Sequence, residues 1–242
     1  MVFNTRLNGV DNLMSRSSIV LFGDSILKGV LYRNGKYEVN HHWEALFSES
    51  FPVTLINRSR FGNTIQKALP GLKRHCSSAA VAPEYALLEL GGNDCDYEWA
   101  SVAAAPDGKH LCKTPAEVFI ASYREAVTLL RESGRIPVAV TLPPILPERY
   151  LQFICSKGLS RSAIMEWLGS ENEIARWQHT YSSLVKQIAR EEQIPLLDLR
   201  HSFPQDPDKL KTLIGSDGIH PSLSGQELIY EFFRRTAETV LS

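Results

Sequence analysis

The stretch Ser18-Ile19-Val20-Leu21-Phe22-Gly23-Asp24-Ser25 decides the fold class, because a short apolar run ends there in a glycine, an acid and a hydroxyl. Four similar apolar runs follow along the chain. None of them alternates cleanly between apolar and polar residues, which is typical of strands that are buried on both faces. The predicted strands cover residues 18–22, 53–59, 85–90, 136–142 and 194–199.

Segments with helical periodicity separate these strands. One predicted helix begins at a capping box, Thr114-Pro115-Ala116-Glu117, and ends near Gly134. Further apolar stripes run through residues 174–188 and 228–240, whereas Pro70-Gly71 should break or restart the helix that follows Gly62. Strands that alternate with helices predict an α/β fold, in which a parallel sheet is covered by helices on both faces.

The chain of 242 residues is predicted to form a single domain over residues 1–242, since no linker or internal repeat divides it. Two stretches are longer than a connection needs, and we expect long loops at 95–113 and 143–170, the second with a short helix near 162–168. Loops of this length in a compact domain usually serve as lids or pocket walls.

Composition narrows the function classes. Lysine and arginine number 26 against 27 acidic residues, a net charge of -1, which gives no indication of nucleic acid or another polyanionic partner. No secretory signal or membrane span is visible, so a cytoplasmic protein is expected. The four cysteines form no C-x-x-C pair, and neither a metal site nor a cofactor motif is seen.

Polar clusters follow the predicted strands. They are Gly23-Asp24-Ser25, Asn57 with Gly62-Asn63-Thr64, Gly91-Gly92-Asn93-Asp94, and Asp217-Gly218-Ile219-His220-Pro221. Each alone is as well explained by an ordinary turn or helix cap. In parallel sheets, however, ligands bind outside the carboxyl ends of the strands, so the four clusters together predict one site.

The clusters contain a serine and the residues that could activate it as a nucleophile. A serine hydroxyl needs an adjacent base, and His220 is the natural one because histidine titrates near neutral pH. Asp217 lies three residues before His220, on the same face of a helix-like turn, and could orient the imidazole. Asp198, at the end of the last predicted strand, is an alternative orienting residue.

Attack by Ser25 on an acyl carbon would create an oxyanion that needs positioned donors. The backbone N–H of Gly62 is unobstructed by a side chain, and Asn93 can offer its side-chain amide. The N–H of Ser25 is a third donor, expected at the start of a helix, where N–H groups are unpaired.

These four blocks, in this order, resemble those of the SGNH hydrolases, also called the GDSL esterase/lipase family, with Ile26 in place of the usual leucine. The resemblance implies a three-layer α/β/α fold with a five-stranded parallel sheet in the flavodoxin-like order 2-1-3-4-5. It also implies Ser25 as nucleophile, Asp217 and His220 as the rest of a catalytic triad, and an oxyanion hole made by Ser25, Gly62 and Asn93. The implied reactions are hydrolysis of esters and of thioesters without a cofactor.

The chain is therefore predicted to be a serine esterase, lipase-like, acting on a small-molecule acyl ester. A carbohydrate O-acetylesterase or an acyl thioesterase with the same triad remains open, as does a non-catalytic binding module on this fold. A phosphate-binding loop after the first strand is disfavoured, because Lys28 precedes Gly29 instead of following it. Aromatic and aliphatic residues in the long loops either line an acyl pocket or pack the loops down: Tyr97, Trp99, Ile145, Leu146 and Trp167.

Overall fold

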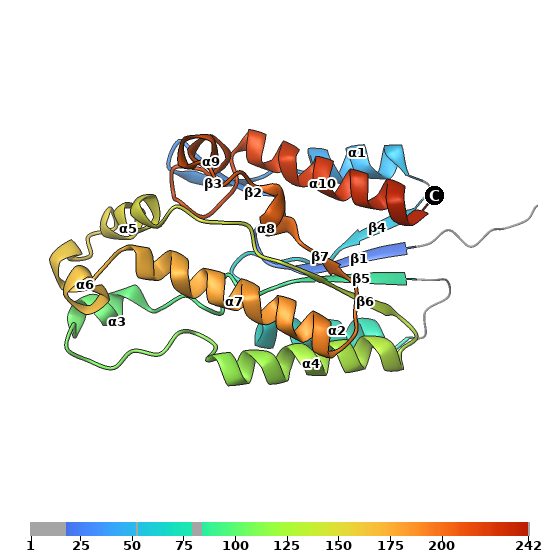
Figure 1. Ribbon diagram of the computed structural model, residues 1–242, viewed down its shortest axis with the longest axis horizontal. Helices are drawn as coiled ribbons and strands as arrows, with labels where there is room; N and C mark the ends of the chain where they lie inside the picture. Colours follow the sequence, from blue (N-terminus) through green and yellow to red (C-terminus); the bar gives the residue numbers. More distant parts are fainter. Residues whose placement is uncertain (1–17, 52, 79–83, 242) are drawn as a thin grey trace, which may run out of the picture.

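The computed structural model describes residues 18–51, 53–78 and 84–241, with side chains as far as residue 237. Within these ranges a parallel sheet of five strands has the order β4-β1-β5-β6-β7 (Figure 1). This confirms the expected order 2-1-3-4-5. The strands are β1 (Ser18–Gly23), β4 (Thr54–Asn57), β5 (Glu84–Glu89), β6 (Ile136–Val140) and β7 (Leu196–Leu197).

The last strand, β7, is much shorter than the predicted 194–199. Pro195 has no N–H to donate to a ladder, and the chain turns into α8 (Leu199–Ser202) directly after Asp198. Apolar composition alone therefore overestimated its length.

One face of the sheet is covered by α2 (Ile65–Cys76), α4 (Ala116–Glu132) and α7 (Asn172–Glu191). Helix α2 runs through Pro70, contrary to the predicted break. Pro70 is exposed, so water can solvate the carbonyl that its ring leaves unpaired, while buried Ile65 and Leu72 hold the helix to the sheet.

The predicted capping box at the start of α4 is also wrong. Pro115 is the N-cap, and no side chain caps this helix. The N–H of Thr114 donates instead to the backbone oxygen of Asp94 at 2.9 Å. The helix therefore begins one residue later than the capping box predicted, with Pro115 in place of Thr114 as N-cap.

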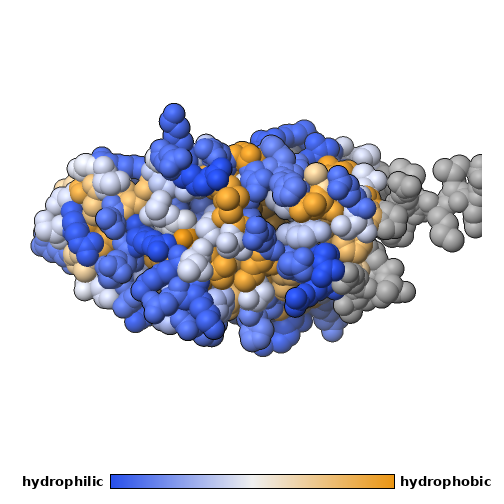
Figure 2. Space-filling model, turned by 90° about the horizontal axis from the view of Figure 1, so that it is seen from above, coloured by the Kyte–Doolittle hydropathy of each residue, from blue (hydrophilic) through white to orange (hydrophobic). Residues whose placement is uncertain are grey.

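The opposite face is covered by α1 (His42–Ser50) and α10 (Leu223–Leu241), with α8 and α9 (Pro207–Leu213) beside them (Figure 1). An apolar cavity of about 160 Å³ lies between the sheet and these helices, lined among others by Trp43, Phe47 and Phe233. Figure 2, seen from this side, shows hydrophobic side chains near the middle of this face, among many hydrophilic ones.

A third group of helices gathers beyond the carboxyl ends of the strands (Figure 1). It consists of α3 (Trp99–Ala104), α5 (Pro147–Cys155) and α6 (Arg161–Leu168), which share one apolar cluster. Helix α6 confirms the short helix predicted near 162–168, whereas α3 and α5 lie in stretches that were predicted as loops. These helices are short and bury their apolar residues against each other, so none of them shows a helical repeat of apolar residues over several turns in the sequence.

A hairpin that the sequence analysis missed follows the first strand. It joins β2 (Val30–Arg33) to the antiparallel β3 (Lys36–Val39). Its turn, Asn34-Gly35, has φ of 52° and 75°, as a type I′ turn requires. An Asn-Gly pair between Tyr32 and Tyr37 is a recognised hairpin signal, and it was available in the sequence.

Across the described part of the chain, no helix combines the length and the apolar character that a membrane crossing needs. In the same ranges no group of three or more histidine, cysteine, aspartate or glutamate side chains is arranged to hold a metal ion.

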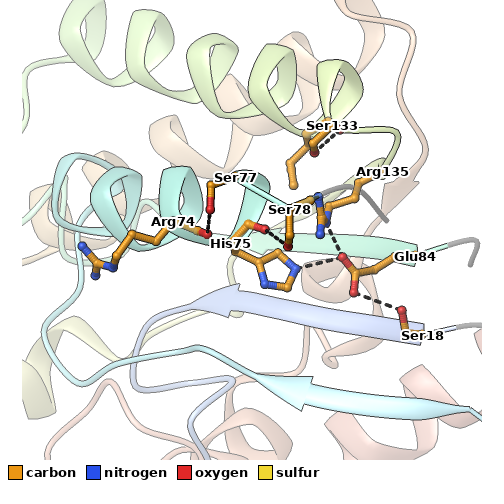
Figure 3. A network of polar contacts seen from close by, with 9 residues as sticks. Ser18, Arg74, His75, Ser77, Ser78, Glu84, Ser133 and Arg135 are labelled. Carbon is orange, nitrogen blue, oxygen red and sulfur yellow. Dashed lines mark hydrogen bonds and ion pairs between the residues drawn. The ribbon is translucent and has the colours of Figure 1, made fainter. Parts of the chain in front are cut away.

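A buried ion network ties the amino end of β5 to α2 (Figure 3). Glu84 lies 2.8 Å from His75 Nε2, accepts a bond from Ser18 Oγ at 3.0 Å, and is paired with the Nε of buried Arg135. Burial raises the pKa of Glu84, but the bonds from His75, Arg135 and Ser18 outweigh it and lower the pKa. A lowered pKa stabilises the fold above the ordinary pKa of glutamate, and this contribution is lost as the pH falls through the folded pKa.

We expect Glu84→Gln to lower the free energy of unfolding by about 3 kcal/mol, because Arg135 stays buried without its counter-charge. Urea unfolding followed by circular dichroism measures the change. Glu125→Gln, which removes the exposed partner of Lys73, is the matched control and should cost less than about 1 kcal/mol. Equal losses in the two variants would contradict the assigned role of Glu84.

Candidate active site

Three residues from opposite ends of the chain form a hydrogen-bonded row at the carboxyl edge of the sheet. Ser25 Oγ lies 2.9 Å from His220 Nε2, and His220 Nδ1 lies 2.5 Å from Asp217 Oδ2. The three residues are 7 %, 2 % and 0 % exposed in the order Ser25, His220, Asp217. The structure thus brings together the residues that the sequence predicted as nucleophile, base and orienting carboxylate.

Ser25 sits on a tight turn directly after the central strand β1. Asp24 Oδ1 accepts the N–H of Ile26 at 2.8 Å, and the backbone oxygen of Asp24 accepts the N–H of Lys28 at 3.1 Å. The expected helix at this point is absent: residues 24–29 form consecutive turns that lead into β2. The turn, and not a helix, therefore holds the hydroxyl of Ser25 above the sheet edge.

A short closed loop carries His220 back to β1 from the far edge of the sheet. Ile214 and Pro221 form an antiparallel bridge, and the N–H of Gly215 donates to the His220 oxygen at 2.7 Å. Asp217 Oδ1 accepts the N–H of His220 at 3.1 Å, while its other oxygen accepts from the ring. The three-residue spacing thus fixes both the backbone and the imidazole of His220.

Gly218 anchors this loop to the segment 143–170. Its φ is +81°, and a Cβ on it would lie 2.4 Å from the backbone nitrogen of Tyr150. Its carbonyl accepts the N–H of Leu146 at 2.8 Å. Only glycine fits this approach, so the segment predicted as a pocket wall buttresses the loop that carries the histidine.

Ser25 and His220 open into a small cavity of about 80 Å³. Three of the five loop residues whose role the sequence left open line it, namely Tyr97, Trp99 and Ile145. Leu146 and Trp167 do not line it and pack into apolar clusters instead. Tyr150 and Trp177, from α5 and α7, complete the aromatic walls.

Asn93 lines the same cavity, and its Nδ2 donates to Asp24 Oδ2 at 3.0 Å. An amide nitrogen carries two N–H groups, so one remains for a ligand. Gly62 is not among the residues lining the cavity. It lies in the loop after β4 with φ of +67°, between Phe61 and Asn63, and its service as an oxyanion donor stays a prediction.

Two buried carboxyl groups lie beneath the nucleophile turn. Glu89 is paired in register with Gly23, and its buried carboxyl group interacts with Asp24. Burial and the charge of Asp24 raise the pKa of Glu89 well above its ordinary range. Burial also raises the pKa of Asp24, against the N–H of Ile26. The N–H of Ile26 and the amide of Asn93 favour the charged form of Asp24, whereas burial and the charge of Asp24 favour the protonated form of Glu89.

Two exposed aromatic rings cover the imidazole, and sequence reasoning missed both. Phe61 stacks on His220 with centroids 5.8 Å apart and planes 12° apart, and Tyr37 meets the ring edge-on at 5.3 Å. Tyr37 comes from the missed hairpin. Phe61 is the neighbour of Gly62 in the sequence, but the sequence analysis considered only the backbone N–H of Gly62.

Asp198, the alternative orienting residue, lies elsewhere. Its oxygens accept from Thr141 Oγ1 at 2.8 Å and from Lys186 Nζ at 2.7 Å. It therefore braces the junction of β6, α7 and α8, and the carboxylate on His220 is that of Asp217.

Serine hydrolases on several unrelated folds carry a serine, a histidine and an aspartate in a hydrogen-bonded row of this kind. The family model described as GDSL-like lipase/acylhydrolase matches residues 21–228, and the chain belongs to this family. It is an ester-hydrolysing enzyme.

Known proteins agree with this assignment. The GDSL esterase/lipase CPRD49 of Arabidopsis thaliana is 24 % identical over 220 residues, covering 89 % of this chain and 76 % of its own. The isoamyl acetate-hydrolyzing esterase of Saccharomyces cerevisiae is 22 % identical over 233 residues, covering 93 % and 88 %. A lipolytic G-D-S-L protein from Veillonella parvula shares the fold with a TM-score of 0.61 and 16 % identity, covering 93 % and 97 %.

Asp94 gives the site a measurable pH signature. Burial raises its pKa to about 6, although both its oxygens accept the N–H of Ile65, at 3.1 and 3.2 Å. Since the folded pKa is the higher one, the stabilisation from this group is complete below about pH 4 and falls as the pH rises to about 6.

We expect a carbon-13 NMR titration of the Asp94 carboxyl to give a pKa near 6, with Asp94→Asn identifying the signal. Between about pH 4 and 6 the free energy of unfolding of the wild type should fall relative to that of the variant, and above this range the difference should stay constant. A titration near the ordinary aspartate value would refute the argument from burial.

Proposed function

We propose that the protein hydrolyses a small carboxylic ester through an acyl-enzyme, with Ser25 as nucleophile, His220 as general base and acid, and Asp217 as orienting carboxylate. The observation that carries the proposal is the row in which Ser25 Oγ lies 2.9 Å from His220 Nε2 and Nδ1 lies 2.5 Å from Asp217. The first contact is short enough for the hydroxyl proton to pass to Nε2, and the second orients the imidazole.

In the first step Ser25 Oγ bonds to the acyl carbon while its proton passes to His220 Nε2. The carboxylate of Asp217, which is bonded to Nδ1, stabilises the imidazolium. The tetrahedral intermediate then expels the alcohol, which takes the proton from Nε2. Water repeats the sequence on the acyl-serine and releases the acid.

The oxyanion of the intermediate would be held by the N–H groups of Ser25 and Gly62 and by the Nδ2 of Asn93. Support comes from Asn93, which lines the cavity and is held by Asp24 on one side only. Donors fixed before the reaction are worth about 3–4 kcal/mol each in such sites.

The acyl group fits the cavity beside Ser25. The cavity volume of about 80 Å³ is small compared with the roughly 300–1,000 Å³ of pockets that bind drug-sized ligands. A cavity of this size favours a short acyl chain. The yeast relative is named for hydrolysing an acetate ester. An acetylated sugar or an acyl thioester would place the same acyl group here and differ in the group released.

A fluorophosphonate probe should label wild-type protein at Ser25, because it traps a serine activated by an adjacent base. Ser25→Ala should abolish both labelling and hydrolysis of p-nitrophenyl acetate. Ser122→Ala is the matched control, since that serine is as buried as Ser25 but lies on α4, away from the cavity. Mass-spectrometric assignment of the label to any other serine would overturn the proposal.

Asp217→Asn should lower kcat by about 10³–10⁴-fold with the fold intact, because an amide stabilises the wrong tautomer of His220. Asp198→Asn should stay within a few-fold of wild type, since its carboxylate does not touch the imidazole. Steady-state kinetics on both variants tests the role. Comparable losses in the two would count against Asp217 as the orienting group.

A further inference from the structure

A second and larger cavity lies on the other side of the loop 57–63 from Ser25. It holds about 650 Å³ and runs between this loop and α2, ending at His75 and Ser78. We call it the basic groove, because its lining includes Lys28, Arg58, Arg60, Lys67 and Arg74. The predicted active-site turn lies behind the same loop, since the N–H of Arg60 donates to Gly23 at 3.1 Å.

The charge of the groove is unbalanced. Among the described residues, no aspartate or glutamate lines it, although the whole chain has a net charge of -1. Within the same ranges no acidic side chain pairs with Arg58, Arg60 or Arg74. Figure 3 shows the contrast on α2: His75 turns to Glu84, while the guanidinium of Arg74 points away from that network. A groove lined by several positive side chains and by no carboxylate favours an anionic ligand.

The arginines of the groove suit one kind of anion in particular. Arg58, Arg60 and Arg74 all line it. A guanidinium presents several N–H donors in a planar fork, which matches the oxygen atoms of a phosphate group.

The groove begins where the leaving group of the proposed reaction would depart. Phe61 lines the groove, and the same ring stacks on His220. His220 Nε2 hands its proton to the departing oxygen or sulfur, so the rest of that group must pass beside the imidazole. The path over Phe61 leads from there to Arg58 and Arg60.

We propose that the basic groove binds the phosphate of a phosphate-bearing leaving group, so that the natural substrate is a short-chain acyl ester of a phosphorylated alcohol or thiol. This rests on the proposed function, because it takes the acyl group to be held at Ser25. The small cavity then limits the acyl chain, and the groove selects the group that is released.

The test compares two esters with the same acyl group, 1-butyrylglycerol and 1-butyrylglycerol 3-phosphate. The phosphorylated ester should have a kcat/KM at least about tenfold higher, chiefly through a lower KM, and the advantage should shrink with added salt. Arg58→Gln/Arg60→Gln should remove the advantage and leave the neutral ester within about twofold. Arg190→Gln, on the exposed surface of α7, is the control for charge and should change neither ester.

The double substitution should not disturb the fold, since both arginines contribute only their backbone N–H groups to the sheet edge, bonding Leu21 and Gly23. Urea unfolding checks this. Calorimetric titration of Ser25→Ala with glycerol 3-phosphate should show binding that the added Arg58→Gln/Arg60→Gln change abolishes.

Three results would overturn the proposal: equal kcat/KM for the two esters, an advantage that survives the double substitution, or binding of inorganic phosphate without any preference between the esters. Failure of the proposed function would look different. Neither ester would then be cleaved and Ser25 would stay unlabelled, whereas the titration would still report on the groove.

Discussion

The hydrogen bond between Ser25 and His220 joins residues that are 195 positions apart, and most of the architecture serves to make it possible. Strand β1, paired on both sides by β4 and β5, fixes the turn that carries Ser25. The loop with His220 follows α9 and is held by its own bridge and by Gly218 against Tyr150. Two rigid supports are needed because a misplacement of about 1 Å already weakens such chemistry about a hundredfold.

The sheet and the grouping of the polar residues could be predicted from the sequence, for physical reasons. Strands covered on both faces must be continuously apolar, and parallel strands bring the residues that follow them to one edge. The strand order came from the resemblance to a family, and the structure confirms it. Ser25, Asp217 and His220 do lie together, while their catalytic roles remain predictions.

What the sequence analysis missed depends on tertiary context. Pro70 is tolerated in α2 because it faces water while its neighbours are buried, which no local rule shows. Helices α3 and α5 were missed because they are short and their apolar residues pack against each other and α6 instead of the sheet. The sequence analysis missed the basic groove because the net charge is a sum over the whole chain, whereas folding places cations from the turn after β1, the loop after β4 and α2 along one groove. Only the Asn34-Gly35 hairpin had a signal that was overlooked.

The stacking of the Phe61 ring on His220 affects the relative stability of the neutral and protonated imidazole. An aromatic ring carries partial negative charge on its face, so it attracts a cation within about 6 Å more than it attracts a neutral ring. The imidazole would be cationic only while it holds the serine proton, and the phenyl face, with centroids 5.8 Å apart, would then favour that transient state over the resting one. A hydrocarbon side chain would thereby contribute differential stabilisation to a proton transfer in which it takes no covalent part.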